Sequence, residues 1–411
     1  MDGGISVTSK KTLHSLSLKN FLSYGSEGEE LRLEPLNVLI GPNSSGKSNI
    51  IEALSLLRAA PSDFAGNIRE GGGISDWLWK GSQTTPVAGI EAVVDYPEGT
   101  QPLRYKLNFT MVGQRLEITD EAIENIRPLS DQQDVYFYYR YQNGRPALNV
   151  RTKIDAPAGQ LTDRVLRKLQ REQLIPDQSV LSQRKDPDQY PELTYLGQQF
   201  GNFRLYREWN LGRYTPPRLP QKADLPEDFL SESADNLGLV LNNLEHYNDT
   251  KRYLLDRLRH FYDGVTDLTT RIQGGTVQIF IHERGLRQPI PATRLSDGML
   301  RYLCLLAVLL HPSPPPLVCI EEPELGMHPD MLSTIAELLI EASERMQLIV
   351  TTHSDTLVSA LHSTPESVIV CERDDQGTHL ERLDPDQLEV WLEKYSLGQL
   401  WRMGEIGGTR W

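Results

Sequence analysis

The sequence predicts an α/β fold with an antiparallel β subdomain and a mostly helical insertion. An apolar run at 36–40 is followed by a glycine-rich turn and a helical pattern at 48–59, and another apolar run at 316–322 ends in two acidic residues. Residues 87–150 alternate between apolar and polar side chains, as strands with one solvent-facing side do. Residues from about 160 to 262 instead have mostly helical periodicity.

The first part of the chain, residues 1–155, is expected to hold strands of more than one sheet. Alternating or apolar runs at 13–25 and 31–41 are joined by a turn rich in glycine and glutamate. The strands over 87–150 are expected to include a hairpin at Asn143–Gly144, because Asn-Gly favours the tight turns that suit antiparallel strands.

The second part, residues 156–265, is expected to be an inserted, mostly helical lobe. Its clearest helical runs are 163–174 and 237–261, and a proline-rich joint at 214–226 separates them. The third part, residues 266–411, returns to short strands and then alternates apolar helices with apolar strands. We expect the first and third parts to form one body around the insertion.

The composition indicates a soluble protein of a reducing compartment. Hydrophobic residues make up 39% of the 411 residues and charged residues 24%, which is ordinary for a globular chain. Cys304, Cys319 and Cys371 are scattered, so neither a disulfide framework nor structural zinc is expected. The N-terminus lacks the apolar core of a signal peptide, and no apolar run is long enough to span a bilayer. We therefore expect a cytoplasmic protein that does not contact a membrane.

One region is basic although the net charge of −14 disfavours nucleic-acid binding by the chain as a whole. Between Arg145 and Lys222 the chain has 14 Lys and Arg residues against 8 Asp and Glu. Within 202–222, arginines alternate with aromatic rings, as in grooves that bind single-stranded DNA. Alternatively, these rings pack on the rest of the protein. We favour packing, and keep possible DNA binding through the 145–222 region as the alternative.

The segment GPNSSGKS fits the phosphate-binding pattern G-x-x-x-x-G-K-[ST]. It lies between a strand and a helix, so its backbone N–H groups can surround phosphate oxygens at a helix N-terminus. Lys47 would reach the β- and γ-phosphates of ATP, and Ser48 would ligate Mg²⁺. The alternative, a chance Gly/Ser turn, is disfavoured by the strand–helix context. The residues expected to contact the nucleotide here are Gly41, Pro42, Asn43, Ser44, Ser45, Gly46, Lys47, Ser48 and Asn49.

Two adjacent glutamates, Glu321 and Glu322, follow the apolar run PLVCI. A phosphate-binding loop needs such a strand beside it, because Mg²⁺ requires a second carboxylate anchor and the attacking water requires a base. We assign Glu321 to the water shell of the metal and Glu322 to polarising the water. The alternative is a solvated strand end, which would suffice if the segment stood alone.

Two further segments are candidates for phosphate contacts. Ser296 opens LSDG at the start of an apolar helix, 25 residues before Glu321, and a small polar residue with a glycine at a helix start can bind an anion. His353 follows another apolar strand, 31 residues after Glu322, and can face the same phosphate. Taken alone, LSDG is usually a helix cap, and a single histidine is usually a packing or capping residue.

Together these four motifs resemble those of ABC-type ATPases of the SMC/RecF/OLD-like branch, above all the AAA_21/AAA_15 predicted ATPases. LSDGMLR stands where the superfamily has its signature sequence, IEEPELGMHP resembles its Walker B motif and D-loop, and TTHS resembles its switch histidine. The resemblance implies a P-loop NTPase fold of the ABC-type head that binds ATP and Mg²⁺. It also implies hydrolysis with Lys47, Glu322 and His353 as catalytic residues.

The resemblance further implies an ATP-dependent homodimer, in which the signature of one protomer caps the nucleotide held by the other. Ser296 and Gly298 would bind the γ-phosphate in trans, and the D-loop residues 324–326 would cross the interface. Tyr24 or Phe21 would stack on the adenine. The sequence departs from the family pattern at Glu321, Asp297 and Met299, where aspartate, glycine and glutamine are usual, and the glutamine loop is left unplaced, with Gln83 only one option.

The biological role that the resemblance implies is a switch in DNA maintenance or repair. The alternative is an ATPase subunit of an anti-phage defence system that controls a separately encoded nuclease or other effector. A transporter ATPase is disfavoured, because the inserted middle resembles DNA-type heads and the chain has no membrane segment.

Overall fold

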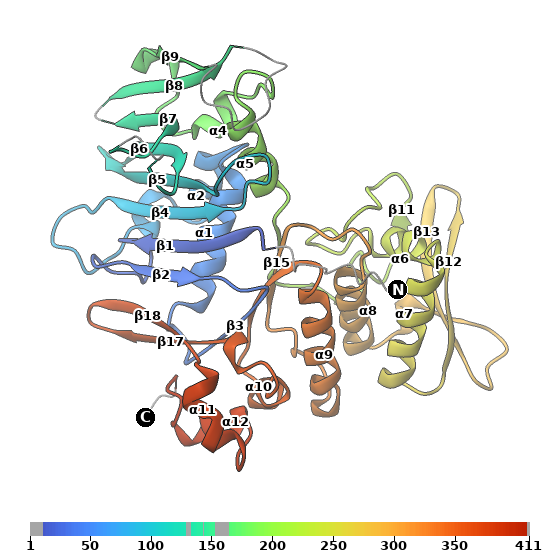
Figure 1. Cartoon of the computed structure of the whole chain (residues 1–411). Helices are drawn as coiled ribbons and strands as arrows, with labels where there is room; N and C mark the ends of the chain where they lie inside the picture. The colour runs from blue at the N-terminus through green and yellow to red at the C-terminus, as the bar shows by residue number, and fades with distance from the viewer. Residues whose placement is uncertain (1–10, 129–132, 143, 153–163, 409–411) are drawn as a thin grey trace, which may run out of the picture.

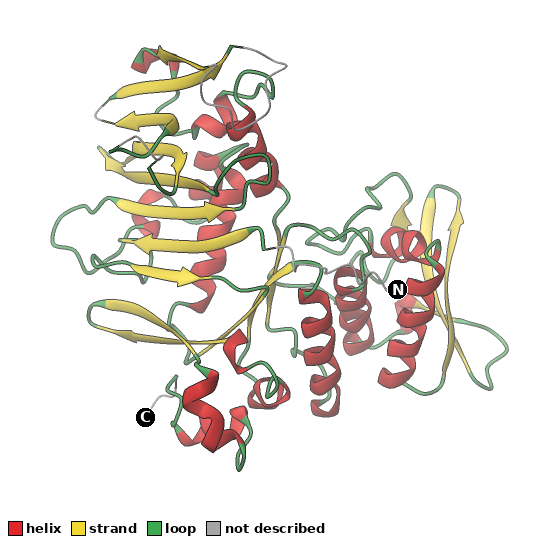
Figure 2. Ribbon diagram, in the orientation of Figure 1, coloured by secondary structure: helices red, strands yellow, loops and turns green. Residues whose placement is uncertain are grey.

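The computed structural model describes residues 11–128, 133–142, 144–152 and 164–408 (Figures 1 and 2). It contains three sheets, of which the central one has six strands. An eight-stranded antiparallel sheet with its helices lies on one side of the molecule, and a smaller sheet with helices lies on the other (Figure 1). The α/β fold with an antiparallel β subdomain is therefore confirmed.

Five strands of the central sheet run parallel, and the sixth closes one edge as the second strand of a hairpin. The carboxyl ends of the parallel strands meet at one edge, where open α/β sheets bind their ligands. In the order of the sheet, the strands are β10 (Arg204–Tyr206), β15 (Leu317–Glu321), β16 (Gln347–Thr351), β3 (Leu36–Ile40), β17 (Val368–Asp374) and β18 (Gly377–Arg382).

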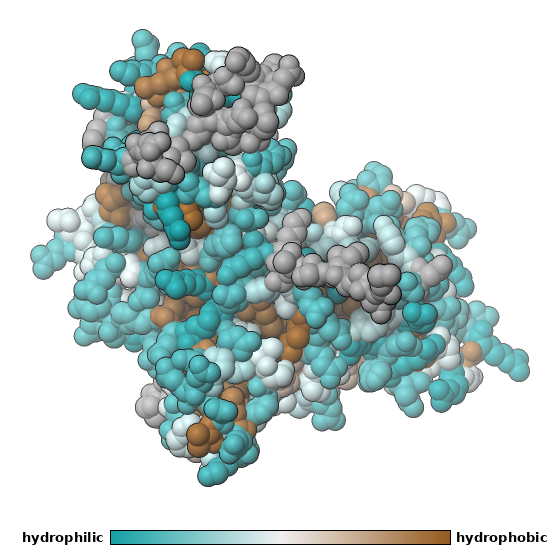
Figure 3. Space-filling view, viewed as in Figure 1, coloured by the Kyte–Doolittle hydropathy of each residue, from teal (hydrophilic) through white to brown (hydrophobic). Residues whose placement is uncertain are grey.

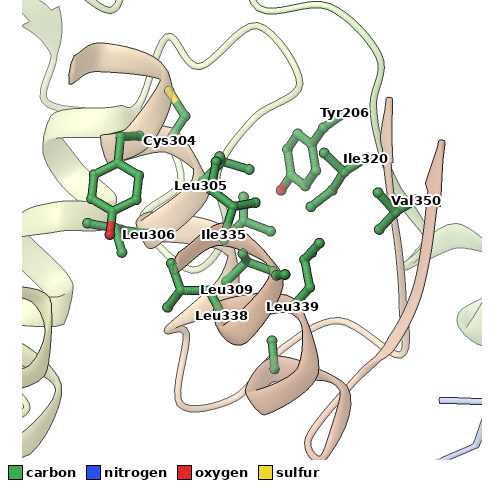
Figure 4. Close-up of a cluster of buried hydrophobic side chains, with 14 of the residues drawn as sticks. Tyr206, Cys304, Leu305, Leu306, Leu309, Ile320, Ile335, Leu338, Leu339 and Val350 are labelled. Carbon is green, nitrogen blue, oxygen red and sulfur yellow. The ribbon is translucent and has the colours of Figure 1, made fainter. Parts of the chain in front are cut away.

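The central sheet is buried on both faces, which explains why its strands are apolar at successive positions. Alternate residues of β15 belong to two separate cores, Leu317 and Cys319 to one and Val318 and Ile320 to the other. One core is covered by α1 (Lys47–Ala59), α2 (Phe64–Glu70), α3 (Ile74–Trp77) and α5 (Pro191–Gly201), and the other by α8 (Asp297–Leu309) and α9 (Leu332–Ser343). Figure 4 shows side chains of α8 and α9 packed against the sheet residues Ile320 and Val350.

The antiparallel sheet has the strand order β2-β1-β4-β5-β6-β7-β8-β9. These strands are β1 (Leu13–Lys19), β2 (Glu29–Arg32), β4 (Ala88–Val94), β5 (Leu103–Val112), β6 (Arg115–Asn125), β7 (Phe137–Gln142), β8 (Arg145–Arg151) and β9 (Arg164–Lys168). The hairpin predicted at Asn143–Gly144 is confirmed, because Gln142 of β7 pairs with Arg145 of β8. Asn143 itself lies outside the described residues.

One predicted element is wrong, because the described part of 163–174 is not an α-helix. It holds β9, which pairs antiparallel with β8, and a short 3-10 helix at Arg171–Gln173. The edge of β8 offers unpaired backbone groups, and the Arg164 side chain is buried in an ion pair with Glu192 of α5. These tertiary contacts override the helical periodicity of the segment.

Helices provide most of the regular structure in the rest of the inserted segment, but its strands join all three sheets. β9 extends the antiparallel sheet, β10 the central sheet and β11 the third sheet. The insertion is thus interwoven with the rest of the fold, and the domain boundaries at 155 and 265 stay a prediction. The remaining elements of the segment are α4 (Val180–Gln183), α6 (Leu237–Glu245), α7 (Asn248–Phe261) and β11 (Gln221–Lys222). The third sheet is completed by β12 (Val265–Gln273), β13 (Thr276–Glu283) and β14 (Ile290–Pro291), which follow it in the chain.

The C-terminal part holds three short helices, which lie on one side of the β17–β18 hairpin (Figure 1): α10 (Asp355–Ala360), α11 (Pro385–Leu392) and α12 (Leu397–Met403). The face of the molecule in Figure 3 is mostly hydrophilic, and its hydrophobic side chains gather in small separate groups. None of the helices in the described ranges is long and apolar enough to cross a membrane.

Candidate nucleotide-binding site

The carboxyl ends of the parallel strands open into a cavity of about 370 Å³. β3 leads into the glycine-rich loop, β15 ends next to Glu322, and β16 ends two residues before His353. Because these ends lie at one edge of the sheet, residues that are about 300 positions apart in sequence meet here. The cavity is lined by Asn43, Ser44, Gly46, Lys47, Ser48, Asn49, Glu322, Thr351, His353 and Arg373.

The glycine-rich loop presents positive charge to this cavity. Gly46 has a φ of 104°, and a Cβ there would lie 2.3 Å from the Thr378 hydroxyl, so this position requires glycine. Lys47 is buried, and its ammonium group donates to the carbonyls of Gly41 (2.7 Å) and Pro42 (2.9 Å). Burial lowers the pKa of Lys47. The ammonium group and the N-terminus of α1 together suit a phosphate chain.

Side chains distant in sequence support the loop from beneath. The Thr378 hydroxyl, on β18, donates to the carbonyl of Ser45 at 2.9 Å and lies 2.6 Å from the Ser23 hydroxyl. Asn49 in turn donates to the Ser23 hydroxyl at 2.7 Å. Sequence reasoning missed Ser23 and Thr378, because neither belongs to a local motif and only the fold brings them to the loop.

The two rings expected at the adenine, Tyr24 and Phe21, are both fully buried. The Tyr24 hydroxyl donates to the carbonyl of Gly46 at 3.1 Å, and Phe21 packs against the rings of Trp77 and Phe109. A ring without exposed surface cannot stack on a base. The expectation is therefore wrong, because packing in the core takes precedence over exposure of these rings.

Ser48 and Glu321 lie side by side, and the Ser48 hydroxyl hydrogen-bonds to the Glu321 carboxylate. Burial raises the pKa of Glu321, and the negative charge of nearby Glu322 raises it further. Arg207 and the Ser48 hydroxyl partly offset this rise. A divalent cation would offset this crowding of negative charge, and a hydroxyl beside a carboxylate fits the oxygen ligands that Mg²⁺ prefers. In the described part of the chain no three His, Cys, Asp or Glu side chains form a metal site, so phosphate oxygens and water would supply the other ligands.

Glu322 and His353 both line the cavity and lie next to each other, with Glu322 Oε1 3.8 Å from His353 Nε2. Glu322 has a φ of 47°, a strained conformation that folds often retain at functional sites. Both side chains are more than a third exposed, so water can reach them. A carboxylate beside an imidazole can orient a water molecule and accept its proton.

Glu324 turns toward its own chain. Its Oε1 accepts hydrogen bonds from the Thr352 hydroxyl (2.7 Å) and from the main-chain N–H of His353 (2.9 Å). The glutamate thereby ties the turn after β15 to the end of β16. Leu325, the next residue, is 47% exposed, which leaves its side chain available for an intermolecular contact.

The signature residues lie outside the cavity of their own chain. Ser296 caps α8 by accepting from the N–H of Met299 at 3.1 Å, and a Cβ at Gly298 would lie 2.8 Å from the carbonyl oxygen of Gly326. Neither Ser296 nor Gly298 lines the cavity, and neither does Gln83, which lies in an exposed loop. The structure therefore brings Gly298 next to the predicted D-loop rather than next to Lys47.

The AAA_21 family, described as "AAA domain, putative AbiEii toxin, Type IV TA system", matches residues 36–359, which is most of the chain. The chain belongs to this family. Its ATPase motifs place this AAA_21 protein in the SMC/RecF/OLD-like branch of ABC-type ATPases, as the sequence predicted.

Relatives of the AAA_21 protein support the same branch. It is 36% identical over 85 residues to the Old nuclease of Escherichia phage P2, covering 20% of this chain and 14% of that protein. It is 28% identical over 207 residues to the DNA replication and repair protein RecF of Staphylococcus haemolyticus, covering 47% of this chain and 51% of RecF. The matched segment spans about half the length of RecF and much less of the nuclease.

The fold of the AAA_21 protein is that of an SMC head. A crystal structure of an Smc head bound to the C-terminal winged-helix domain of ScpA superposes with a TM-score of 0.55 at 14% identity, covering 92% of this chain and 99% of that chain. At an identity this low, the likeness supports the P-loop ATPase fold but gives no ground for a shared partner.

The basic segment at 202–222 of the AAA_21 protein packs on the head, as the favoured interpretation expected. Phe203, Tyr206 and Trp209 are buried, so a groove of rings for DNA bases is not present in this described segment, where Tyr214 is the exposed ring. Arg207 forms two hydrogen bonds with the Glu52 carboxylate of α1, at 2.5 and 3.0 Å. One arginine of this segment therefore lies beside the proposed metal residues.

Proposed function

We propose that this AAA_21 protein binds ATP with Mg²⁺ and hydrolyses it. The observation that carries the proposal is the convergence of three parallel strands on one cavity lined by Lys47, Ser48, Glu322 and His353. The glycine-rich loop, Glu322 and His353 follow three separate strands, so no single sequence motif accounts for their position at one cavity. Phosphoryl transfer needs this set of groups, because catalysis rests on positioning and on neutralising the phosphate charge.

Each residue has a distinct proposed role. The residues from Gly41 to Asn49 bind the phosphate chain through the loop backbone and the Lys47 ammonium group. Ser48 and Glu321 would hold Mg²⁺, which when bound neutralises charge that develops on the phosphate oxygens. Glu322 accepts a proton from the attacking water, and His353 holds the γ-phosphate and the water in place.

We further propose that ATP closes two copies of the chain around two nucleotides. In that dimer Ser296 and Gly298 of one protomer would meet the nucleotide of the other, since they do not line their own cavity. Hydrolysis would reopen the dimer, which makes the protein an ATP-dependent switch.

Glu322→Gln is the decisive variant for this proposal. It keeps the size of the side chain but removes the base, so we expect ATP binding to be retained, the dimer to persist, and turnover to fall by about 10²- to 10⁴-fold. Phosphate release and light scattering after gel filtration measure the two effects. Glu344→Gln, an exposed change at the end of α9, is the matched control. Turnover near the wild-type rate in Glu322→Gln would show that Glu322 is not the base.

For the biological role we propose a switch in DNA maintenance or repair, supported by the match to RecF over about half of the chain. Exposed basic residues of the 145–222 region, such as Arg145, Arg167 and Lys168, are available for phosphate contacts. Stimulation of the ATPase rate of the purified protein by DNA, lost at high salt, is the test.

The alternative role is control of a separately encoded nuclease or other effector in anti-phage defence. The match to the phage Old nuclease and the toxin–antitoxin description of the family favour it. An ATPase rate that is unchanged by DNA but changes with a co-purifying effector would favour this role over the first.

A further inference from the structure

Arg373 adds a cation to the cavity that no motif of the sequence indicated. It lies near the end of β17, which runs parallel to β3 on the side away from β16, so its carboxyl end reaches the same edge of the sheet. Its side chain is exposed and lines the cavity together with Lys47 and Ser48. Its Nη1 lies 3.5 Å from the carbonyl oxygen of Ser44 in the glycine-rich loop.

Contacts on both sides of Arg373 fix its backbone against the loop. Two residues earlier, the carbonyl of Cys371 packs so closely on Gly41 that a Cβ at Gly41 would lie 2.2 Å from its oxygen. Directly across the hairpin from Arg373, Thr378 donates to the carbonyl of Ser45 at 2.9 Å. The hairpin therefore holds the Arg373 backbone in a set position relative to the loop, which lowers the entropy lost when its side chain binds a ligand.

The acidic neighbours of Arg373 are engaged elsewhere. Glu372 accepts from the main-chain N–H of Gly408 at 2.7 Å, and Asp374 accepts from that of Gln376 at 2.7 Å. Within the described ranges, no carboxylate forms an ion pair with Arg373. The guanidinium group thus lines the cavity without a carboxylate of the described ranges paired to it.

We propose that Arg373 is a phosphate-binding residue of the nucleotide site and acts as a second cation beside Lys47. A guanidinium group can bond two phosphate oxygens at once, whereas an ammonium group acts as a point charge. The ligand class is a nucleoside polyphosphate, and the inference rests on the proposed binding of ATP. Because Arg373 belongs to the same chain as the loop, it contributes to affinity before any dimer forms.

The test measures binding of ATP and of inorganic tripolyphosphate to the full chain, by displacement of a fluorescent ATP analogue. Arg373→Ala is expected to weaken both ligands by about 10- to 100-fold, as the loss of a hydrogen bond between charged groups does. Arg373→Lys, which keeps the charge, is expected to lie between the wild type and Arg373→Ala. Unchanged affinities in Arg373→Ala would overturn the proposal. A loss for ATP alone would also overturn it, because the contact would then be with the base or ribose.

Two controls separate this inference from the proposed function. Arg402→Ala removes another exposed arginine of the C-terminal part and is expected to leave both affinities unchanged. Lys47→Ala is expected to abolish binding. If Lys47→Ala loses ATP binding while Arg373→Ala binds ATP like the wild type, only the proposed role of Arg373 is refuted. If the wild-type protein binds no ATP, the proposed function and the role of Arg373 are both refuted. Thermal unfolding of each variant checks that it is folded.

Discussion

At the residue scale, two adjacent glutamates have different surroundings and so suit different tasks. Glu321 is the last residue of β15, is partly buried and is bonded by the Ser48 hydroxyl, whereas Glu322 follows in a strained conformation opposite His353. Burial raises the pKa of Glu321. Keeping this carboxylate ionised without a cation therefore costs free energy, and a bound Mg²⁺ would offset that cost.

Glu321→Gln is expected to stabilise the nucleotide-free protein while impairing its site. The pKa of Glu321 is raised in the folded state, so ionisation of this carboxyl group lowers the free energy of unfolding at neutral pH. In acid the group is protonated in the folded and in the unfolded protein, and this effect disappears. We expect the Tm of the variant to rise by about 1–3 °C at pH 7.5, with no rise below the pKa of an unfolded glutamate.

The same variant is expected to bind ATP about 10- to 100-fold more weakly in the presence of Mg²⁺. Calorimetric unfolding across pH and titration of Mg²⁺ measure the two effects, with Glu344→Gln as control. If the Tm of Glu321→Gln is below that of the wild type at pH 7.5, the charge of Glu321 does not destabilise the nucleotide-free protein and the prediction is wrong.

At the element scale, the β17–β18 hairpin supports the glycine-rich loop rather than merely closing the sheet. Thr378 bonds the loop carbonyl of Ser45 and lies against the Ser23 hydroxyl, and the carbonyl of Cys371 fits against Gly41. The C-terminal segment also lies against the loop, since a Cβ at Gly408 would be 3.4 Å from the Cα of Gly41. Strands from the far end of the chain thus hold the geometry of the loop.

Thr378→Val is expected to loosen the loop, because it leaves the buried carbonyl of Ser45 without the threonine hydroxyl. We expect a loss of about 1–3 kcal/mol in the free energy of unfolding and weaker ATP binding. Thr364→Val is the matched control, since among the described residues the Thr364 hydroxyl is buried without a hydrogen-bond partner. Denaturant unfolding of both variants compares them, and equal stabilities would refute a supporting role for the Thr378 hydroxyl.

At the scale of the whole molecule, the proposed dimer would bring together parts of the site that lie apart in a single chain. The cavity opens at the edge of the central sheet, but the signature glycine lies against Gly326 of the D-loop, outside that cavity. Leu325, between Glu324 and Gly326, exposes an apolar side chain next to this contact. A dimer that apposes signature and cavity would cover the D-loop of each protomer.

Leu325→Asp is expected to weaken the ATP-dependent dimer, because it places a charge on an apolar surface that the dimer would bury. Light scattering of Glu322→Gln with ATP, with and without the added Leu325→Asp change, measures the shift from dimer to monomer. ATP binding to the monomer is expected to stay within about twofold, since Leu325 does not line the cavity. Leu286→Asp, at another exposed leucine, is the control, and a dimer that tolerates Leu325→Asp would argue against this interface.

The residues of the cavity could be named from the sequence where a local motif holds them. The loop from Gly41 to Ser48, Glu322 after β15 and His353 after β16 each follow an apolar strand, and parallel strands end at one edge. Local pattern and tertiary position agree at these places, so the sequence alone determined the fold class and most of the cavity.

The residues that surround those motifs follow from long-range packing and could not be read from local patterns. Segment 163–174 has helical periodicity, yet its residues 164–168 pair with β8 as a strand. The rings of Tyr24 and Phe21 fill the core instead of facing a base. Arg373 and Thr378 reach the loop because β17 pairs with β3. The contacts of Arg373 and Thr378 with the loop join residues more than 300 positions apart. A long-range contact of this kind leaves no periodicity or spacing in the sequence from which it could be predicted.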